Sequence, residues 1–125
     1  MGRYRVTVEG AFSASHQLVT YDGLLEPMHG HRWRVEVRLV GERLDEMGVL
    51  IDFVVVEKLL NDILTGFHDR HLNDLSPFKQ ANPSAENVAR AIFESVREKL
   101  DAPDLLERVT VWEAPNCSAS YSEET

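Results

Sequence analysis

Three of the five histidines in this chain stand where they could bind one metal ion. His29 and His31 flank Gly30 just before a strand-like segment, so their side chains point to the same side of an extended chain. His16 lies at the end of an earlier extended segment, and pairing of the two strands would add a third imidazole. Three neutral nitrogen ligands leave the fourth position of a tetrahedral zinc ion open, which is the catalytic rather than the structural pattern.

Further residues near these histidines bear on the same chemistry. Glu26, three residues before His29, would hold a carboxylate close to the open metal position. A His-Gly-His sequence on its own is more often a surface or packing feature than a pair of ligands. The three histidines together with an upstream acid and a second cluster of His and Asp residues favour a catalytic metal site, the second cluster being His68, Asp69 and His71.

Composition and charge exclude several classes of protein. The 125 residues, of which 43% are hydrophobic and 27% charged, predict one globular domain over residues 1–125. The net charge of −8 and the absence of a Lys/Arg cluster interleaved with aromatic residues argue against a nucleic-acid partner.

The chain also lacks the patterns of exported and membrane proteins. Arg3 and Arg5 stand where a secretory signal would need an apolar run, and no later stretch is apolar enough to span a membrane. We therefore expect a cytoplasmic protein without a membrane partner. Cys117 is the only cysteine, which excludes an intrachain disulfide, and we expect it to be a small buried residue.

Hydrophobic periodicity predicts the elements that must position these side chains. Asp52 and Ser84 are suitable N-caps for two amphipathic helices, and Gly66 suits the end of the first. Glu26 falls on a loop between the first two strands. The expected strands cover residues 4–13 with His16 at their end, 32–39 continuing the face of His29 and His31, 49–51 as a short strand, 108–113 and 117–121.

The order of the long elements is strand, strand, helix, helix, strand, strand. This order predicts an α+β domain in which an antiparallel four-stranded sheet is covered on one face by two helices. Such a sheet leaves its edges unpaired, so ring-like oligomerisation through these edges is expected.

Several motifs stand in a characteristic order along the chain, at residues 12–16, 29–31, 51–53, 72–73, 82–87 and Glu113. Through these motifs the sequence resembles the 6-pyruvoyl-tetrahydropterin synthase superfamily, which includes the 6-carboxy-tetrahydropterin synthases of queuosine biosynthesis. The resemblance implies the tunnelling fold, in which sheets of several subunits join into a barrel, and a homo-oligomer that is a trimer or hexamer. It also implies Zn²⁺ bound by His16, His29 and His31. The match covers nearly the whole chain.

Two further residues match positions that contact the pterin substrate in that superfamily. Glu113 matches a glutamate that anchors the pterin ring, and a carboxylate can accept two hydrogen bonds from the 2-amino group and the adjacent ring N–H. Without the resemblance, Glu113 would be interpreted as a solvated residue at the end of a strand. Ser84 matches a hydroxyl that contacts the pterin, although helix capping explains this serine equally well.

The chain departs from the superfamily pattern at two catalytic positions. The superfamily's cysteine, about four residues before His-Gly-His, is missing, because Leu25 and Glu26 stand there. Glu-x-x-His-Gly-His instead resembles the branch that supplies folate synthesis. The usual Asp-His pair is reversed to His68-Asp69, which could still couple, or Asp69 and His71 could form the pair. Alternatively, His68 could be a helix-end residue stabilised by the helix dipole.

These observations lead to a main hypothesis and two rivals. The main hypothesis is a zinc-dependent lyase that converts 7,8-dihydroneopterin triphosphate to 6-hydroxymethyl-7,8-dihydropterin, with Glu26 as general base and His68 and Asp69 as catalytic partners. The first rival is a 6-carboxy-tetrahydropterin synthase that works without the thiol. The second is a metal- or pterin-binding protein without catalytic activity.

Overall fold

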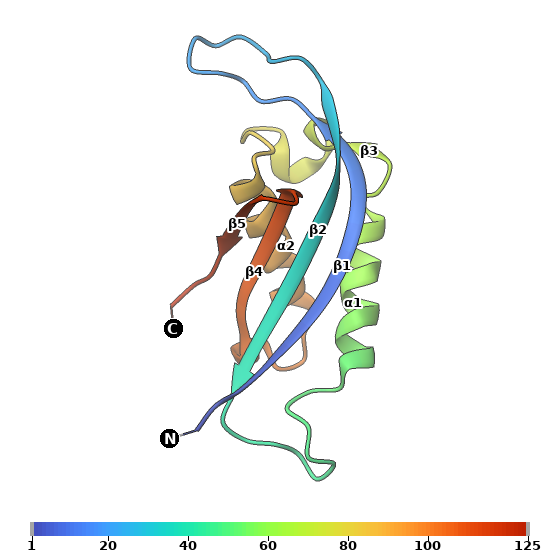
Figure 1. Cartoon of the computed structure of the whole chain (residues 1–125), viewed down its shortest axis with the longest axis vertical. Helices are drawn as coiled ribbons and strands as arrows, with labels where there is room; N and C mark the ends of the chain where they lie inside the picture. Colours follow the sequence, from blue (N-terminus) through green and yellow to red (C-terminus); the bar gives the residue numbers. More distant parts are fainter. Residues whose placement is uncertain (1, 125) are drawn as a thin grey trace.

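A computed structural model describes residues 2–124 as an α+β fold built on one five-stranded sheet. The strand order is β3-β1-β2-β4-β5, and both helices lie on the same side of the sheet (Figure 1). The two longest strands, β1 (Tyr4–His16) and β2 (His29–Gly41), pair antiparallel along their whole length. Their register places His16 opposite His29, so the two strand ends that carry histidines meet.

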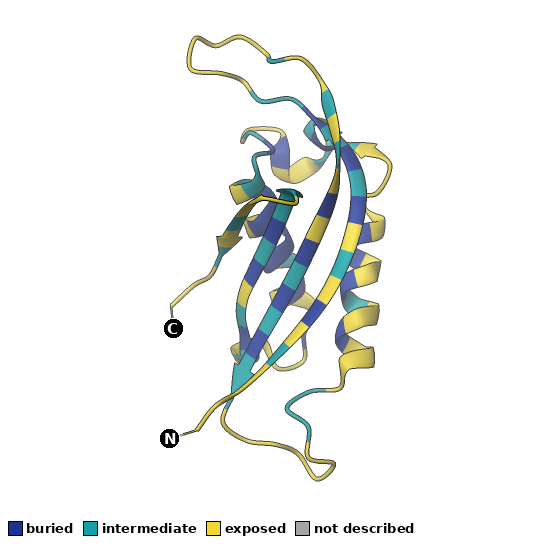
Figure 2. Ribbon diagram, viewed as in Figure 1, coloured by how far each residue is buried: buried dark blue, intermediate teal, exposed yellow. Residues whose placement is uncertain are grey.

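Alternation along β2 separates a buried face from an open one. Trp33, Val35, Val37 and Leu39 are fully buried, whereas the residues between them are exposed or partly exposed (Figure 2). Since side chains alternate between faces along a strand, the helices cover one face and leave the other open. The histidines share the parity of the buried set and extend it past the helices.

The two helices begin at the expected caps. Helix α1 (Phe53–Thr65) follows Asp52, whose side chain accepts a hydrogen bond from the Val54 N–H, and it ends at Gly66. Helix α2 (Ala85–Lys99) follows Ser84, whose hydroxyl accepts a hydrogen bond from the Asn87 N–H. The buried stripe of α2, which packs on β4 and β5, consists of Val88, Ala89, Ile92, Phe93 and Val96.

The remaining elements are short. Strand β4 (Leu106–Ala114) pairs with β2 and with β5 (Cys117–Tyr121), which forms one edge of the sheet. Most of β1 forms the other edge, since β3 covers only the end of it. The 3-10 helices are η1 (Leu72–Asp74), η2 (Ser76–Phe78) and η3 (Pro103–Leu105). Within residues 2–124, no helix has the length and apolarity needed to cross a membrane.

The prediction of a four-stranded, wholly antiparallel sheet was wrong. A fifth strand, β3 (Arg70–His71), pairs parallel with Ala14 and Ser15 of β1. The chain reaches this position through Asp69, which has a left-handed φ of 58° and whose N–H donates to the Ser13 carbonyl at 2.7 Å. A strand of two residues has no periodicity that sequence analysis could detect.

Two smaller expectations were also wrong. Residues 49–51 form no strand, because the Val49 N–H donates to Asp45 in a turn and Leu50 packs on Gly41 at the end of β2. Cys117 is exposed rather than buried, because it begins the edge strand β5.

Candidate metal centre and active site

His16, His29 and His31 converge at the end of the β1–β2 pair. Each offers one ring nitrogen, and these atoms all lie within 4.8 Å of one another. Nδ1 of His29 and Nε2 of His31 are only 2.6 Å apart. The ring of the fully buried Trp33 lies beside two of the imidazoles, with centroids 5.0 Å from His16 and 5.8 Å from His31. The grouping that the sequence predicts is therefore present in the fold.

The hydrogen bonding of His16 fixes which nitrogen faces this cluster. Its ring is fully buried, and Nδ1 lies 2.8 Å from the Pro83 carbonyl, which can only accept. Nδ1 therefore carries a proton, and in the neutral ring, the form that binds metal, Nε2 keeps a lone pair. This Nε2 is buried without a hydrogen bond in the described chain, and Oε1 of Glu113 lies 3.0 Å away.

Two acceptor atoms at this distance repel each other unless a cation neutralises them. A metal ion bound by the three imidazoles would satisfy the buried Nε2 and offset the charge of the Glu113 carboxylate. Burial also lowers the pKa of His31, since desolvation disfavours its charged form more than the nearby Glu113 carboxylate favours it. The neutral imidazole is the form that binds metal, so the residues fit such an ion.

Glu26 lies at the rim of this cluster. Its Oε1 is 2.9 Å from Nε2 of His29 and accepts a hydrogen bond from the Leu18 N–H, also at 2.9 Å. These two contacts lower the pKa of Glu26, with the His29 bond as the larger cause. Within the described residues, its Oε2 makes no hydrogen bond. The carboxylate is thus ionised near neutral pH and held by one oxygen.

Two asparagines hold the segment that carries Glu26. Asn73 accepts a hydrogen bond from the N–H of Gln17 at 2.9 Å and donates to its carbonyl at 2.7 Å. Asn82 makes the same pair of bonds to Val19, at 2.8 and 3.0 Å. Sequence analysis missed this role, although both asparagines belong to motifs that carry the resemblance.

Glu113 also faces a depression beside the histidines. Its Oε1 lies 4.0 Å from Nε2 of His31, and its side chain is about one-third exposed. The depression has a volume of about 540 Å³ and runs along the part of β2 that extends past β4. Glu113 and His31 therefore border this depression. Its other lining residues are Gly30, Arg32, Arg34, Trp112, Ala114 and Pro115.

The other predicted site residues do not join this cluster within one chain. The Ser84 hydroxyl caps α2, one residue after the Pro83 carbonyl that binds His16. His68 accepts a hydrogen bond from the Ser13 N–H through Nδ1, and its Nε2 lies 3.4 Å from the largely exposed Asp69 carboxylate. His68 and Asp69 lie beside β1 at its edge with β3.

No thiol of the described residues lines the cluster of the three histidines. Leu25, which stands four residues before His29, is more than half exposed. Cys117 pairs with Ala114 in the turn between β4 and β5, and its exposed side chain is absent from the lining of the Glu113 depression.

Sequence comparisons find relatives that are named as pterin enzymes. A dihydroneopterin monophosphate aldolase of Pyrococcus furiosus is 29% identical over 87% of this chain and 89% of its own. A 6-carboxy-5,6,7,8-tetrahydropterin synthase of Bacillus subtilis is 32% identical over 82% of this chain and 66% of its own.

A solved structure extends the agreement to the fold. The 6-pyruvoyl tetrahydropterin synthase of Caenorhabditis elegans superposes with a TM-score of 0.88 at 26% identity, over 99% of this chain and 98% of its own. The sequence profile of the 6-pyruvoyl tetrahydropterin synthase family matches residues 5–124. The chain belongs to the 6-pyruvoyl tetrahydropterin synthase family.

Proposed function

We propose that this protein is a zinc-dependent lyase that cleaves the side chain of 7,8-dihydroneopterin triphosphate to 6-hydroxymethyl-7,8-dihydropterin, a step of folate biosynthesis. Its family consists of lyases that act on pterins. The observation that carries the proposal is the position of the Glu26 carboxylate, 2.9 Å from His29 of the three-histidine cluster. No thiol of the described residues lies at this cluster. The Pyrococcus furiosus relative, named as an aldolase of a dihydroneopterin phosphate, supports the same type of reaction.

The expected ion is Zn²⁺, bound by His16, His29 and His31. Three neutral imidazoles with an open fourth position are the donor set of catalytic zinc sites. When bound, the ion supplies a Lewis acid that lowers the pKa of a substrate hydroxyl.

The side chains of this protein supply the proton transfers. Oε2 of Glu26 takes the proton from the hydroxyl on the second side-chain carbon of the substrate, and that carbon becomes an aldehyde carbon. The bond between the first and second carbons breaks, and its electron pair moves into the conjugated ring C=N. Return of a proton to the first carbon gives the hydroxymethyl product and a two-carbon aldehyde that carries the phosphates. Glu113 would hold the pterin ring through its 2-amino group and ring N–H, with Ser84 as a further contact.

We further propose that the protein works as a homo-oligomer, a trimer or hexamer. The exposed edges of β1 and β5 offer unpaired backbone groups for such an assembly. His68 and Asp69 lie away from the metal cluster of their own chain, so a catalytic role for them would require the site of a second copy.

Product analysis tests the proposed reaction. The zinc-loaded protein is incubated with dihydroneopterin triphosphate, and the products are identified by mass. Hydroxymethyl-dihydropterin supports the proposal, whereas carboxy-tetrahydropterin would favour the rival activity for which the Bacillus subtilis relative is named. Binding of the pterin without any product would leave a non-catalytic binding protein.

A further inference from the structure

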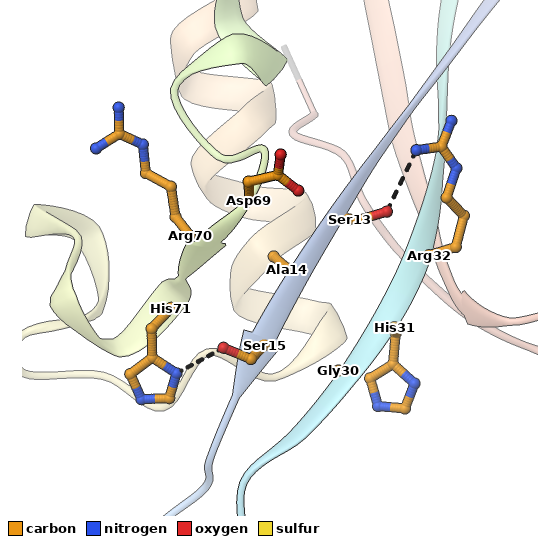
Figure 3. Close-up of a pocket in the computed structure, with 9 residues that line it drawn as sticks. All are labelled: Ser13, Ala14, Ser15, Gly30, His31, Arg32, Asp69, Arg70 and His71. Atoms are coloured by element: carbon orange, nitrogen blue, oxygen red, sulfur yellow. Dashed lines mark hydrogen bonds between the residues drawn. The ribbon is translucent and has the colours of Figure 1, made fainter.

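The orientation of the His16 ring depends on one backbone carbonyl. His16 is the only histidine of residues 2–124 whose ring is hydrogen-bonded to a main-chain carbonyl, that of Pro83 at 2.8 Å. His71, by contrast, lies 2.9 Å from the Ser15 hydroxyl, a group that both donates and accepts (Figure 3). A carbonyl only accepts, so it keeps a proton on Nδ1 of His16 and leaves Nε2 of the neutral ring toward the other two histidines of the cluster.

The chain around the Pro83 carbonyl is held by Asn87. Proline has no N–H, so Pro83 cannot be anchored through its own nitrogen. The peptide unit before it is fixed by the Asn87 side-chain amide, which donates to the Asn82 carbonyl at 2.8 Å. On the other side of Pro83, the Ser84 hydroxyl accepts a hydrogen bond from the Asn87 N–H at 3.2 Å. Asn87 therefore holds the chain on both sides of the carbonyl that orients His16.

Asn87 itself belongs to a well-packed element. It is the third residue of α2, and the next two residues, Val88 and Ala89, are fully buried. This helix packs on β4 and β5. The Pro83 carbonyl is thereby tied to the core of the protein, although it belongs to the loop before the helix.

Helix capping alone does not account for the Asn87 side chain. The cap of α2 uses the backbone N–H of Asn87, which every residue except proline would supply. The side-chain amide makes a separate contact, with a carbonyl that precedes the helix. The side chain can therefore be replaced without removal of the cap.

We propose that Asn87 is a positioning residue of the metal centre. Its amide fixes the peptide unit between Asn82 and Pro83, and the Pro83 carbonyl then holds His16 with Nε2 toward the ion. Groups that orient a metal-bound histidine through its other nitrogen commonly change metal affinity by about tenfold or more when they are lost. The inference rests on the metal ion of the proposed function and is independent of which pterin is the substrate.

Zinc affinity tests this role without any turnover. In competition with a chromophoric chelator, Asn87→Ala should bind zinc about tenfold more weakly than the unaltered protein. Asp52→Ala is the matched control, since it removes the side-chain cap of the other helix, whose start makes no hydrogen bond to His16 or Pro83 in the described chain, and it should keep the affinity. Asn87→Asp keeps the size of the side chain and suits the start of a helix, but its carboxylate cannot donate. It should show the same loss as Asn87→Ala, and it decides the case if the alanine variant does not fold.

NMR of the zinc-saturated protein supplies a second readout, the exchange of the Nδ1 proton of His16 with solvent. This proton is buried and hydrogen-bonded, so it should exchange slowly in the unaltered protein. Its exchange should become faster in Asn87→Ala and stay unchanged in Asp52→Ala. A general loss of stability would instead speed exchange in both variants.

The possible outcomes separate this inference from the proposed function. Zinc affinity or proton exchange that is equal in Asn87→Ala and the unaltered protein overturns the inference, as does an equal loss of affinity in Asp52→Ala. Weaker zinc binding in Asn87→Ala without turnover of any pterin by the unaltered protein rejects the proposed reaction and keeps the inference. Failure of the unaltered protein to bind zinc overturns both.

Discussion

Nε2 of His16 and Oε1 of Glu113 lie 3.0 Å apart, and both are acceptors when the ring is neutral with its proton on Nδ1, which faces the Pro83 carbonyl. Nε2 of His16 is fully buried and makes no hydrogen bond within the described residues. The arrangement is costly for the protein alone and favourable around a cation, so metal binding should be coupled to stability.

Removal of the metal should therefore lower the stability of the fold. Zinc at about 100 times its Kd should stabilise the protein by about 2.7 kcal/mol, and a chelator should reverse the gain. His29→Gln, which changes a partly exposed ligand, should lose stoichiometric zinc, whereas His68→Gln should keep it. Metal analysis and thermal unfolding check this prediction. Full zinc content in His29→Gln would contradict the three-histidine site.

Replacement of Glu26 by glutamine should separate catalysis from metal binding. Glutamine keeps the shape and can still accept the Leu18 N–H, but it cannot take a proton. Since general-base catalysis contributes about a hundredfold or more, kcat should fall by at least that factor with zinc content unchanged. Glu46→Gln, in the exposed turn before α1, is the control. Unchanged turnover in Glu26→Gln would rule out the base.

The long elements and the grouping of the three histidines could be predicted because each depends on local pattern. Alternation along residues 32–39 and capping by Asp52 and Ser84 were both confirmed. The parity of His29 and His31, with His16 at the end of a neighbouring strand, was sufficient to predict the triad.

Features that depend on contacts distant in sequence could not be predicted. Strand β3 exists because Asp69 and Arg70 pair with β1 residues that precede them by more than 50 positions. Two further contacts also join residues that lie far apart in the sequence. These are the buried hydrogen bond from His16 to the Pro83 carbonyl and the hydrogen bonds of Asn82 to Val19. No periodicity in the sequence encodes such partners.

The only cysteine should be dispensable for the reaction. Cys117 is exposed at the start of β5, and no thiol lines the cluster of His16, His29 and His31 in the described chain. Cys117→Ser should therefore keep kcat and KM within about twofold, because exposed substitutions away from a site have small effects. Steady-state kinetics of this variant beside Ser118→Ala provide the check. A large loss confined to Cys117→Ser would assign the proton transfer to a thiol.

Asn82 should act as a positioning residue for Glu26. Asn82→Ala removes two hydrogen bonds that hold Val19, so it should destabilise the fold by about 1–3 kcal/mol. Loosening of residues 17–28 should speed their amide exchange and lower kcat more than it raises KM. Asn61→Ala, on the exposed face of α1, is the matched control. Equal exchange of this segment in Asn82→Ala and the unaltered protein would contradict the clamp.

The contact between Tyr121 and Glu123 should make the stability of the β5 end depend on pH. The Tyr121 hydroxyl donates to Glu123 at 2.6 Å, and Arg97 also pairs with this carboxylate. The Tyr121 hydrogen bond, followed by that of Arg97, lowers the pKa of Glu123 below its ordinary 4.5. The same carboxylate raises the pKa of Tyr121 above its ordinary 10.0.

The sign of each shift defines the pH range of the contact. Because the Glu123 pKa is lowered, its contribution to the stability of the fold is present above pH 4.5. This contribution is lost as the pH falls through the lowered pKa. Because the Tyr121 pKa is raised, its contribution to the stability of the fold is present below pH 10.0. This contribution is lost as the pH rises through the raised pKa. Tyr121→Phe should thus lower Tm by about 2 °C or less near neutral pH, since Glu123 is exposed and Tyr121 is only partly buried, and by less at a pH well below 4.5. Thermal unfolding against pH, with Tyr4→Phe as control, measures this, and an equal difference at both pH values would show that the hydroxyl acts independently of the Glu123 charge.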